Sequence, residues 1–141
     1  MKGKLSIFLL VLLSLLLFTA CAATPAAGEA PPDSPAGYAQ TIGQGETMFF
    51  FETTGPDGAF AAWEVHTDAD TVGAALLALG LIAGAESEWG LMVNEVNGVV
   101  ADWDENQSFW AFYIGGEFAM AGIDATYIEP GATYALVYTA G

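Results

Sequence analysis

Short apolar segments with strand character, separated by turn residues, make up most of the chain after Glu46 and limit the folds it can adopt. Aromatic and β-branched residues favour strands, whereas Gly, Pro, Asn and Asp favour the turns between them. The turn sequences Gly55-Pro56-Asp57-Gly58 and Asn97-Gly98 predict two β-hairpins. We expect strands at 47–54, 59–67, 89–96, 99–102, 108–114, 117–120 and 133–139.

One segment has a helical period instead. Val72, Leu76 and Leu79 recur on one side of a predicted helix, and Gly80 suits the left-handed position that ends it. The candidates for its N-terminal cap are Asp68, Asp70 and Thr71. A single helix must bury its apolar side against one face of the sheet. The predicted fold class is therefore α+β, a mostly antiparallel sheet with one helix packed on one face.

The beginning of the chain has the features of a secretory signal peptide, because Lys2 and Lys4 precede an uncharged apolar segment at 5–18. The end of this segment, Phe18-Thr19-Ala20-Cys21, resembles the lipobox of bacterial lipoproteins. That resemblance implies lipidation of the Cys21 sulfur and cleavage just before it. The lipid would anchor the protein to the extracytoplasmic face of the cell membrane. The alternative is a plain signal peptide followed by a free or buried cysteine.

Residues 21–45 are rich in Ala, Pro and Gly and have no apolar period, which favours a flexible tether. We therefore expect a lipoprotein signal peptide at 1–20, the tether at 21–45 and one folded domain at 46–141. Because Cys21 is the only cysteine, no disulfide can form within the chain.

The charge of the chain is strongly unbalanced. It has 17 acidic residues, two lysines and no arginine, and its formal charge of −15 becomes −17 once both lysines leave with the signal peptide. Such a surface repels nucleic acid and other polyanions, and it suits an uncharged or cationic ligand. Solubility alone, or a halophilic host, would explain the same excess of acids.

Few side chains are available for catalysis. His66 is the only histidine; its acidic neighbours would suit a general base, and the alternative is an exposed histidine at a strand end. Cys21 is no nucleophile if it carries lipid, and a zinc site of His and Cys ligands cannot be built. P-loop and dinucleotide-binding motifs are absent. The sequence predicts a protein that is not an enzyme, with no catalytic residue and no cofactor.

An acidic segment, Asp102-Trp103-Asp104-Glu105-Asn106, resembles the first ligands of an EF-hand calcium loop. Its sixth position is Gln107 rather than Gly and its twelfth is Tyr113 rather than Glu, so an EF-hand is excluded. A surface calcium site and a solvated hairpin loop both stay open. The loop is the simpler interpretation, and no metal ligand is assigned.

Aromatic residues indicate where a ligand would bind. In the strand richest in aromatics, Phe109 and Tyr113 alternate with Trp110 and Phe112, so both faces of this strand are apolar. Either the strand lies in the core, or one of its faces binds a ligand. Trp103 lies among charged residues in a predicted loop, where burial is not expected. The candidate ligand-binding residues are Trp103, Trp110 and Tyr113.

From about Met48 to its end the chain resembles the family called domain of unknown function 4430 (DUF4430). The resemblance rests on the order and spacing of segments at 70–76, 90–98, 110–117, 122–123 and 129–134, together with Gly80. This family is similar to the C-terminal β-domain of transcobalamin and intrinsic factor, which implies a β-grasp-like fold and no catalysis. In those vitamin carriers the β-domain packs over one face of cobalamin. A helical domain, which has no counterpart in this sequence, covers the other face.

The expected function is binding of a small ligand, a corrinoid related to cobalamin, for delivery to a membrane importer. The alternative is a protein-interaction or adhesion module displayed on the cell surface, with an envelope protein as its partner. A pocket of at least about 300 Å3 would favour the first function. A flat patch or a free strand edge would favour the second.

Overall fold

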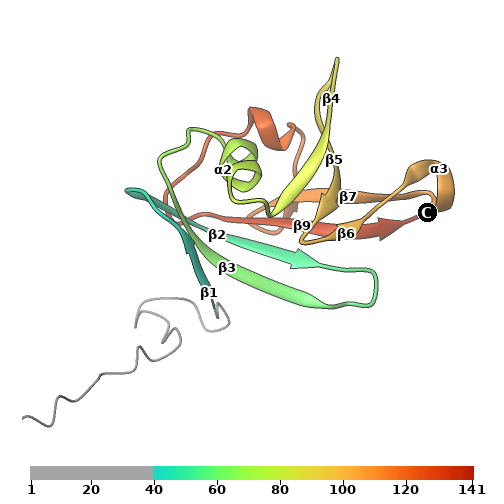
Figure 1. The fold of residues 1–141 in the computed structure, drawn as a ribbon, viewed down its shortest axis with the longest axis horizontal. Helices are drawn as coiled ribbons and strands as arrows, with labels where there is room; N and C mark the ends of the chain where they lie inside the picture. Colours follow the sequence, from blue (N-terminus) through green and yellow to red (C-terminus); the bar gives the residue numbers. More distant parts are fainter. Residues whose placement is uncertain (1–39) are drawn as a thin grey trace, which may run out of the picture.

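The computed structural model describes residues 40–141, and the predicted signal peptide and Cys21 lie outside this range. Two sheets make up most of the described chain (Figure 1). The larger sheet has six strands, in the order β1 (Gln40–Gly43), β3 (Phe60–Thr67), β2 (Thr47–Thr54), β9 (Thr133–Ala140), β7 (Ser108–Ile114) and β8 (Glu117–Phe118). The smaller sheet, which we call the arm, has three strands, in the order β4 (Ile82–Ser87), β5 (Gly90–Val96) and β6 (Val99–Val100).

The helical elements are short. They are α2 (Val72–Ala78), α3 (Trp103–Asn106) and the 3-10 turn η1 (Ile123–Ala125). Figure 1 shows α2 and the arm on the same side of the large sheet. The expected class, a mainly β protein with a helix against one sheet face, is confirmed, but the helix shares that face with a second sheet that was not predicted. Within residues 40–141, no helix has the length and apolar character needed to cross a membrane.

The strands of the large sheet are mostly antiparallel. The exceptions are β1 with β3 and, at the centre of the sheet, β2 with β9, and both of these pairs are parallel. Parallel neighbours require a long connection between them. The segment that joins β2 to β9 contains β3, α2, the arm and β7, so the central pair closes the domain around all of them.

The hydrophobic core lies between the large sheet and the layer formed by α2 and the arm. Phe49 and Phe51 point into it from β2 and are fully buried. Phe49 meets the ring of Tyr134 edge-on, with centroids 5.5 Å apart, and Phe51 stacks on Trp63 at 5.6 Å. The buried Tyr134 hydroxyl accepts a hydrogen bond from the backbone N–H of Glu129 at 2.9 Å, so its oxygen has a partner inside the core.

The helix α2 forms where the helical period predicted it. The Thr71 hydroxyl caps its first turn by accepting a hydrogen bond from the Ala74 N–H at 3.3 Å. Val72 and Leu76 are fully buried. Gly80 has a φ of +68°, which is the left-handed conformation expected just beyond the end of the helix.

The boundary predicted between tether and domain is wrong, because residues 40–43 of the predicted tether are part of the large sheet. They form β1, in which Ile42 lies opposite Val65 of β3. A strand of four residues is too short to show a clear hydrophobic period, and its partner β3 is distant in sequence. β1 could therefore not be predicted from the sequence. The folded domain therefore includes the chain from Gln40 onward.

The strand β4 was also missed, because its sequence has small residues where strands usually carry β-branched ones. Its pairing with β5 determines its conformation instead. The register shifts between Ala83 and Gly84, and a Cβ on Gly84 would lie only 2.2 Å from the carbonyl oxygen of Met92. Glycine is therefore required where the two arm strands approach most closely.

The contact between α2 and η1 also requires a glycine, which gives a test of the packing. A Cβ on Gly73 would lie 2.8 Å from the Cα of Asp124. Alanine favours a helix by about 1 kcal/mol over glycine, yet we expect Gly73→Ala to lower the free energy of unfolding by about 1–3 kcal/mol through overpacking. Urea denaturation followed by circular dichroism measures the change.

The control is Ala74→Gly, at the exposed neighbouring position of the same helix. It should cost about 1 kcal/mol through helix propensity alone. A Gly73→Ala variant more stable than the original chain would show that α2 and η1 are not in close contact.

Candidate functional site

A groove runs between the arm and β7, and we call it the arm groove. Its volume is about 190 Å3. The residues that line it are Leu91, Met92 and Val93 of β5, Phe109, Trp110 and Phe112 of β7, and Gly122, Ile123 and Leu136. Every lining side chain is apolar and none can ionise, so the groove can bind an apolar surface but offers no group for proton transfer.

The strand β7 supplies the aromatic wall of this groove. Trp110 is buried, and its ring meets that of Tyr138 edge-on at 5.4 Å. The Trp110 indole nitrogen is buried and has no hydrogen-bond partner among residues 40–141. The buried Trp63 differs, because its indole nitrogen donates a hydrogen bond to the Gln40 Oε1 at 3.2 Å. The unpartnered donor therefore distinguishes Trp110 from an ordinary core tryptophan.

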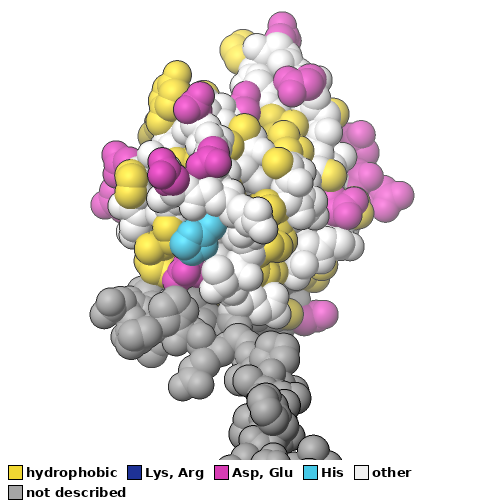
Figure 2. Space-filling model, turned by 60° about the vertical axis from the view of Figure 1, so that its left-hand side comes forward, with side chains coloured by type: hydrophobic (Ala, Val, Ile, Leu, Met, Phe, Trp, Pro, Cys, Tyr) yellow, Lys and Arg dark blue, Asp and Glu magenta, His cyan; other side chains and the backbone are white. Residues whose placement is uncertain are grey.

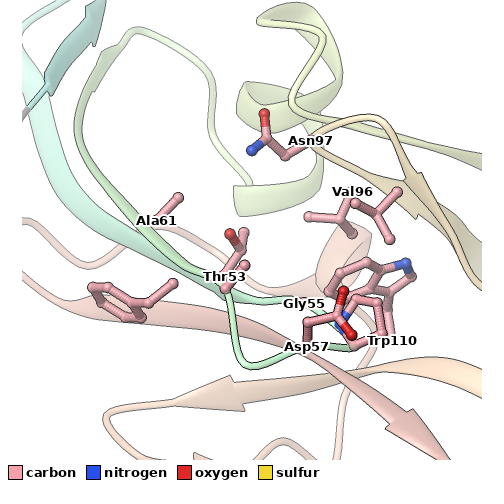
Figure 3. A pocket seen from close by; sticks show the side chains of 11 residues that line it. Thr53, Gly55, Asp57, Ala61, Val96, Asn97 and Trp110 are labelled. Carbon is pink, nitrogen blue, oxygen red and sulfur yellow. The ribbon is translucent and has the colours of Figure 1, made fainter.

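A second cavity, also of about 190 Å3, lies on the other side of Trp110, beside the β2–β3 turn (Figure 3). We call it the hairpin pocket. The residues that line it are Thr53, Gly55, Pro56, Asp57, Ala59, Phe60 and Ala61 from the β2–β3 hairpin, Val96, Asn97 and Val99 from the arm, and Trp110. Asn97 belongs to the predicted Asn97-Gly98 turn, in which both residues have positive φ, at 47° and 79°. Trp110 is the wall that the two cavities share.

Trp103, which was predicted to lie in a loop, is the first residue of α3. The Asp102 carboxylate begins this helical turn by accepting hydrogen bonds from the N–H groups of Asp104 at 2.8 Å and Glu105 at 3.1 Å. The Trp103 side chain is 60% exposed, and its ring lies 6.1 Å from that of Phe109, which lines the arm groove. Trp103 therefore extends the apolar surface of the groove outwards.

Tyr113 lies apart from the other two candidate residues. It is half-buried, and its ring meets that of Phe118 edge-on at 5.7 Å. It lines neither the arm groove nor the hairpin pocket. Strand alternation explains the separation, since Tyr113 points to the sheet face opposite to Trp110.

His66 and Asp102, the two other residues considered in the sequence analysis, interact with nearby residues in the chain. His66 lies 2.8 Å from the Glu64 Oε1 and lines neither cavity. The Asp102 carboxylate is used as a helix cap, as described above. Among residues 40–141, no three His, Cys, Asp or Glu side chains are grouped so that they could hold a metal ion.

The charged side chains on the described surface are acidic. Figure 2 shows Asp and Glu side chains spread over the visible face, with no Lys or Arg among the described residues. Large apolar side chains are also exposed. They include Met120 at 96%, Trp89 at 85%, near the tip of the arm, and Met92 at 60%, which lines the arm groove. Acidic and apolar groups are therefore mixed on the same surface.

Comparisons with known proteins show a family match and two similar folds. The model of a family described as "Domain of unknown function (DUF4430)" matches residues 69–139. The fold is similar to that of a candidate metal-binding protein from Ruminococcus gnavus ATCC 29149, with a TM-score of 0.65 and 28% identity, over 68% of this chain and 99% of that one. It is also similar to haptocorrin in complex with Cbi, with a TM-score of 0.50 and 15% identity, over 67% of this chain and 25% of haptocorrin. No curated protein matches the chain.

A comparison of the two buried tryptophans tests whether the Trp110 indole N–H lacks a hydrogen-bond partner. Trp63 and Trp110 are 6% and 7% exposed, and only Trp63 has an indole hydrogen bond. We expect Trp63→Phe to lower the free energy of unfolding by about 1 kcal/mol more than Trp110→Phe does, because it alone breaks a hydrogen bond. Urea denaturation of both variants measures the difference, and a larger loss for Trp110→Phe would mean that its N–H is satisfied.

Proposed function

The chain belongs to the DUF4430 family, and we propose that it is a non-enzymatic module on the cell surface that binds a corrinoid nutrient for delivery to a membrane importer. The observation that carries the proposal is the arm groove, an apolar cleft with an aromatic wall and no ionisable lining residue. A groove of this kind binds by apolar contact and has no side chain suited to acid–base catalysis.

The size of the groove determines how a corrinoid would bind. Its volume of about 190 Å3 is below the roughly 300 Å3 expected of a pocket that encloses its ligand, so the size criterion stated from the sequence is not met. A corrinoid is far larger, so it would rest one face on the groove and leave its other face exposed. The Trp103–Phe109 pair extends the apolar surface beside the groove and would add to this contact.

The fold supports the same function. The parallel pair β2 and β9 at the centre, flanked by β3 and β7 with α2 across one face, supports the β-grasp assignment. Haptocorrin, which has a similar fold, was crystallised with Cbi. The acidic surface would not oppose an uncharged or cationic ligand. We do not propose a metal site, because no group of suitable ligands exists among residues 40–141.

Loss of one groove side chain gives the test of corrinoid binding. Phe109 lines the groove and is 40% exposed, so it can be shortened without a large loss of stability. We expect Phe109→Ala to weaken cobinamide and cobalamin binding about tenfold, which corresponds to about 1.4 kcal/mol. Equilibrium dialysis with the corrinoid measured by its own absorbance gives the dissociation constants.

The matched control for that measurement is Trp89→Ala, which removes an exposed aromatic ring outside the groove. Its dissociation constant should equal that of the original chain. If the original chain binds neither corrinoid saturably, the proposal fails. If both variants weaken binding equally, the arm groove is not the site.

We further propose that Cys21 carries the lipid anchor, on the basis of the Phe18-Thr19-Ala20-Cys21 sequence. Cys21→Ser should move the protein from the membrane fraction to the soluble fraction, because the acyl chains that retain it can no longer be attached. Cell fractionation followed by immunoblotting measures this change. Retention of the variant in membranes at the original level would exclude the anchor.

A protein-interaction or adhesion module is the second candidate function. It is favoured by β4, which within residues 40–141 pairs only with β5 and exposes every residue after Ile82, leaving an open sheet edge. Such an edge can accept a strand from another protein. Ala83→Lys would place a charge on this exposed edge strand and interfere with strand addition, while the arm groove side chains would remain. Loss of envelope-protein binding with corrinoid binding retained would support this alternative.

A further inference from the structure

We propose that the hairpin pocket is a second binding site, specific for a small organic cation of the quaternary-ammonium type. Trp110 separates this pocket from the arm groove, so the two sites are distinct. The pocket combines a carboxylate, an aromatic wall and a small volume, and together these features point to one class of ligand.

The carboxylate belongs to Asp57, the only ionisable residue that lines the pocket. It makes no hydrogen bond or ion pair within the described residues, and residues 40–141 contain no Lys or Arg that could neutralise it. The turn that carries it is ordered by two backbone hydrogen bonds, from the Gly55 N–H to the Ala59 oxygen at 2.9 Å and from the Gly58 N–H to the Gly55 oxygen at 3.0 Å. The negative charge therefore lies at a defined place beside the cavity (Figure 3).

The aromatic wall belongs to Trp110, which is buried. Phe60 also borders the pocket and is 59% exposed, but strand alternation directs its ring to the sheet face opposite to Ala61 and Trp63. The faces of aromatic rings attract organic cations, and aromatic pockets recognise quaternary ammonium groups in this way. An anion would be repelled by Asp57 and by the acidic surface, and a neutral molecule would make no use of the carboxylate.

The volume excludes larger ligands. About 190 Å3 accommodates a trimethylammonium group with a short substituent, but not a corrinoid. A divalent metal ion needs several oxygen ligands, and the pocket supplies only one carboxylate. The remaining polar side chains, Thr53 and Asn97, can hydrogen-bond a hydroxyl group on such a substituent.

The test compares choline with 3,3-dimethyl-1-butanol, a neutral molecule of nearly the same shape. The full chain in nonionic micelles is titrated with each, and the Trp110 indole N–H signal, assigned with Trp110→Phe, is followed by nitrogen-15 NMR. We expect choline to shift this signal saturably and to bind at least about tenfold more tightly than the neutral analogue, because only choline carries the charge.

Two variants locate the site. Asp57→Asn keeps the shape of the side chain and removes its charge, and it should weaken choline binding about tenfold. Glu86→Gln removes the same charge from β4, outside the pocket, and should leave choline binding unchanged. Equal binding of choline and its neutral analogue would overturn the proposal, as would equal losses in the two variants, which would indicate diffuse attraction to an acidic surface. Neither result bears on corrinoid binding in the arm groove, which is measured separately.

Discussion

The parallel pairing of β2 with β9 is the constraint on which the rest of the domain depends. Backbone hydrogen bonds extend the pair, from the Phe50 N–H to the Ala132 oxygen and from the Gly131 N–H to the Met48 oxygen, both at 2.8 Å. Because these strands lie near the two ends of the domain and run in the same direction, the segment between them must cross over the sheet. That crossover contains α2 and the arm, and it covers one face of the sheet.

The arm is the least regular part of this crossover segment. It leaves the sheet as a separate hairpin and approaches β7 only along part of its length, so the space between them is filled incompletely. Trp110 lines the cavity that remains there, and it also lines the hairpin pocket beside the β2–β3 turn. The buried Trp110 N–H without a hydrogen-bond partner lowers stability, and a residue with a purely structural role would avoid this loss by making a hydrogen bond. The same residue thus supports the core and shapes both proposed sites.

The sequence predicted the strands β2 and β7 and the helix α2 well, since each has a strong local period. It predicted the site only partly. Of the three candidate residues, Trp110 lies in the wall of the groove, Trp103 lies beside it through Phe109, and Tyr113 belongs to neither cavity. Phe109 was not among the candidates. Strand alternation places it with Tyr113 on the face opposite to Trp110, yet near the beginning of β7 it borders the groove.

The sequence alone determined the turns at Gly55-Pro56-Asp57-Gly58 and Asn97-Gly98, the end of α2 at Gly80, and the strands between such turns. These depend on backbone conformations and periods that neighbouring residues set. Tertiary structure decided the rest. The strands β1 and β4 exist only because distant partners pair with them, and both cavities, together with the place of Asp57 beside one of them, arise where segments far apart in the sequence meet. No local pattern records such meetings, because they depend on the packing of the whole chain.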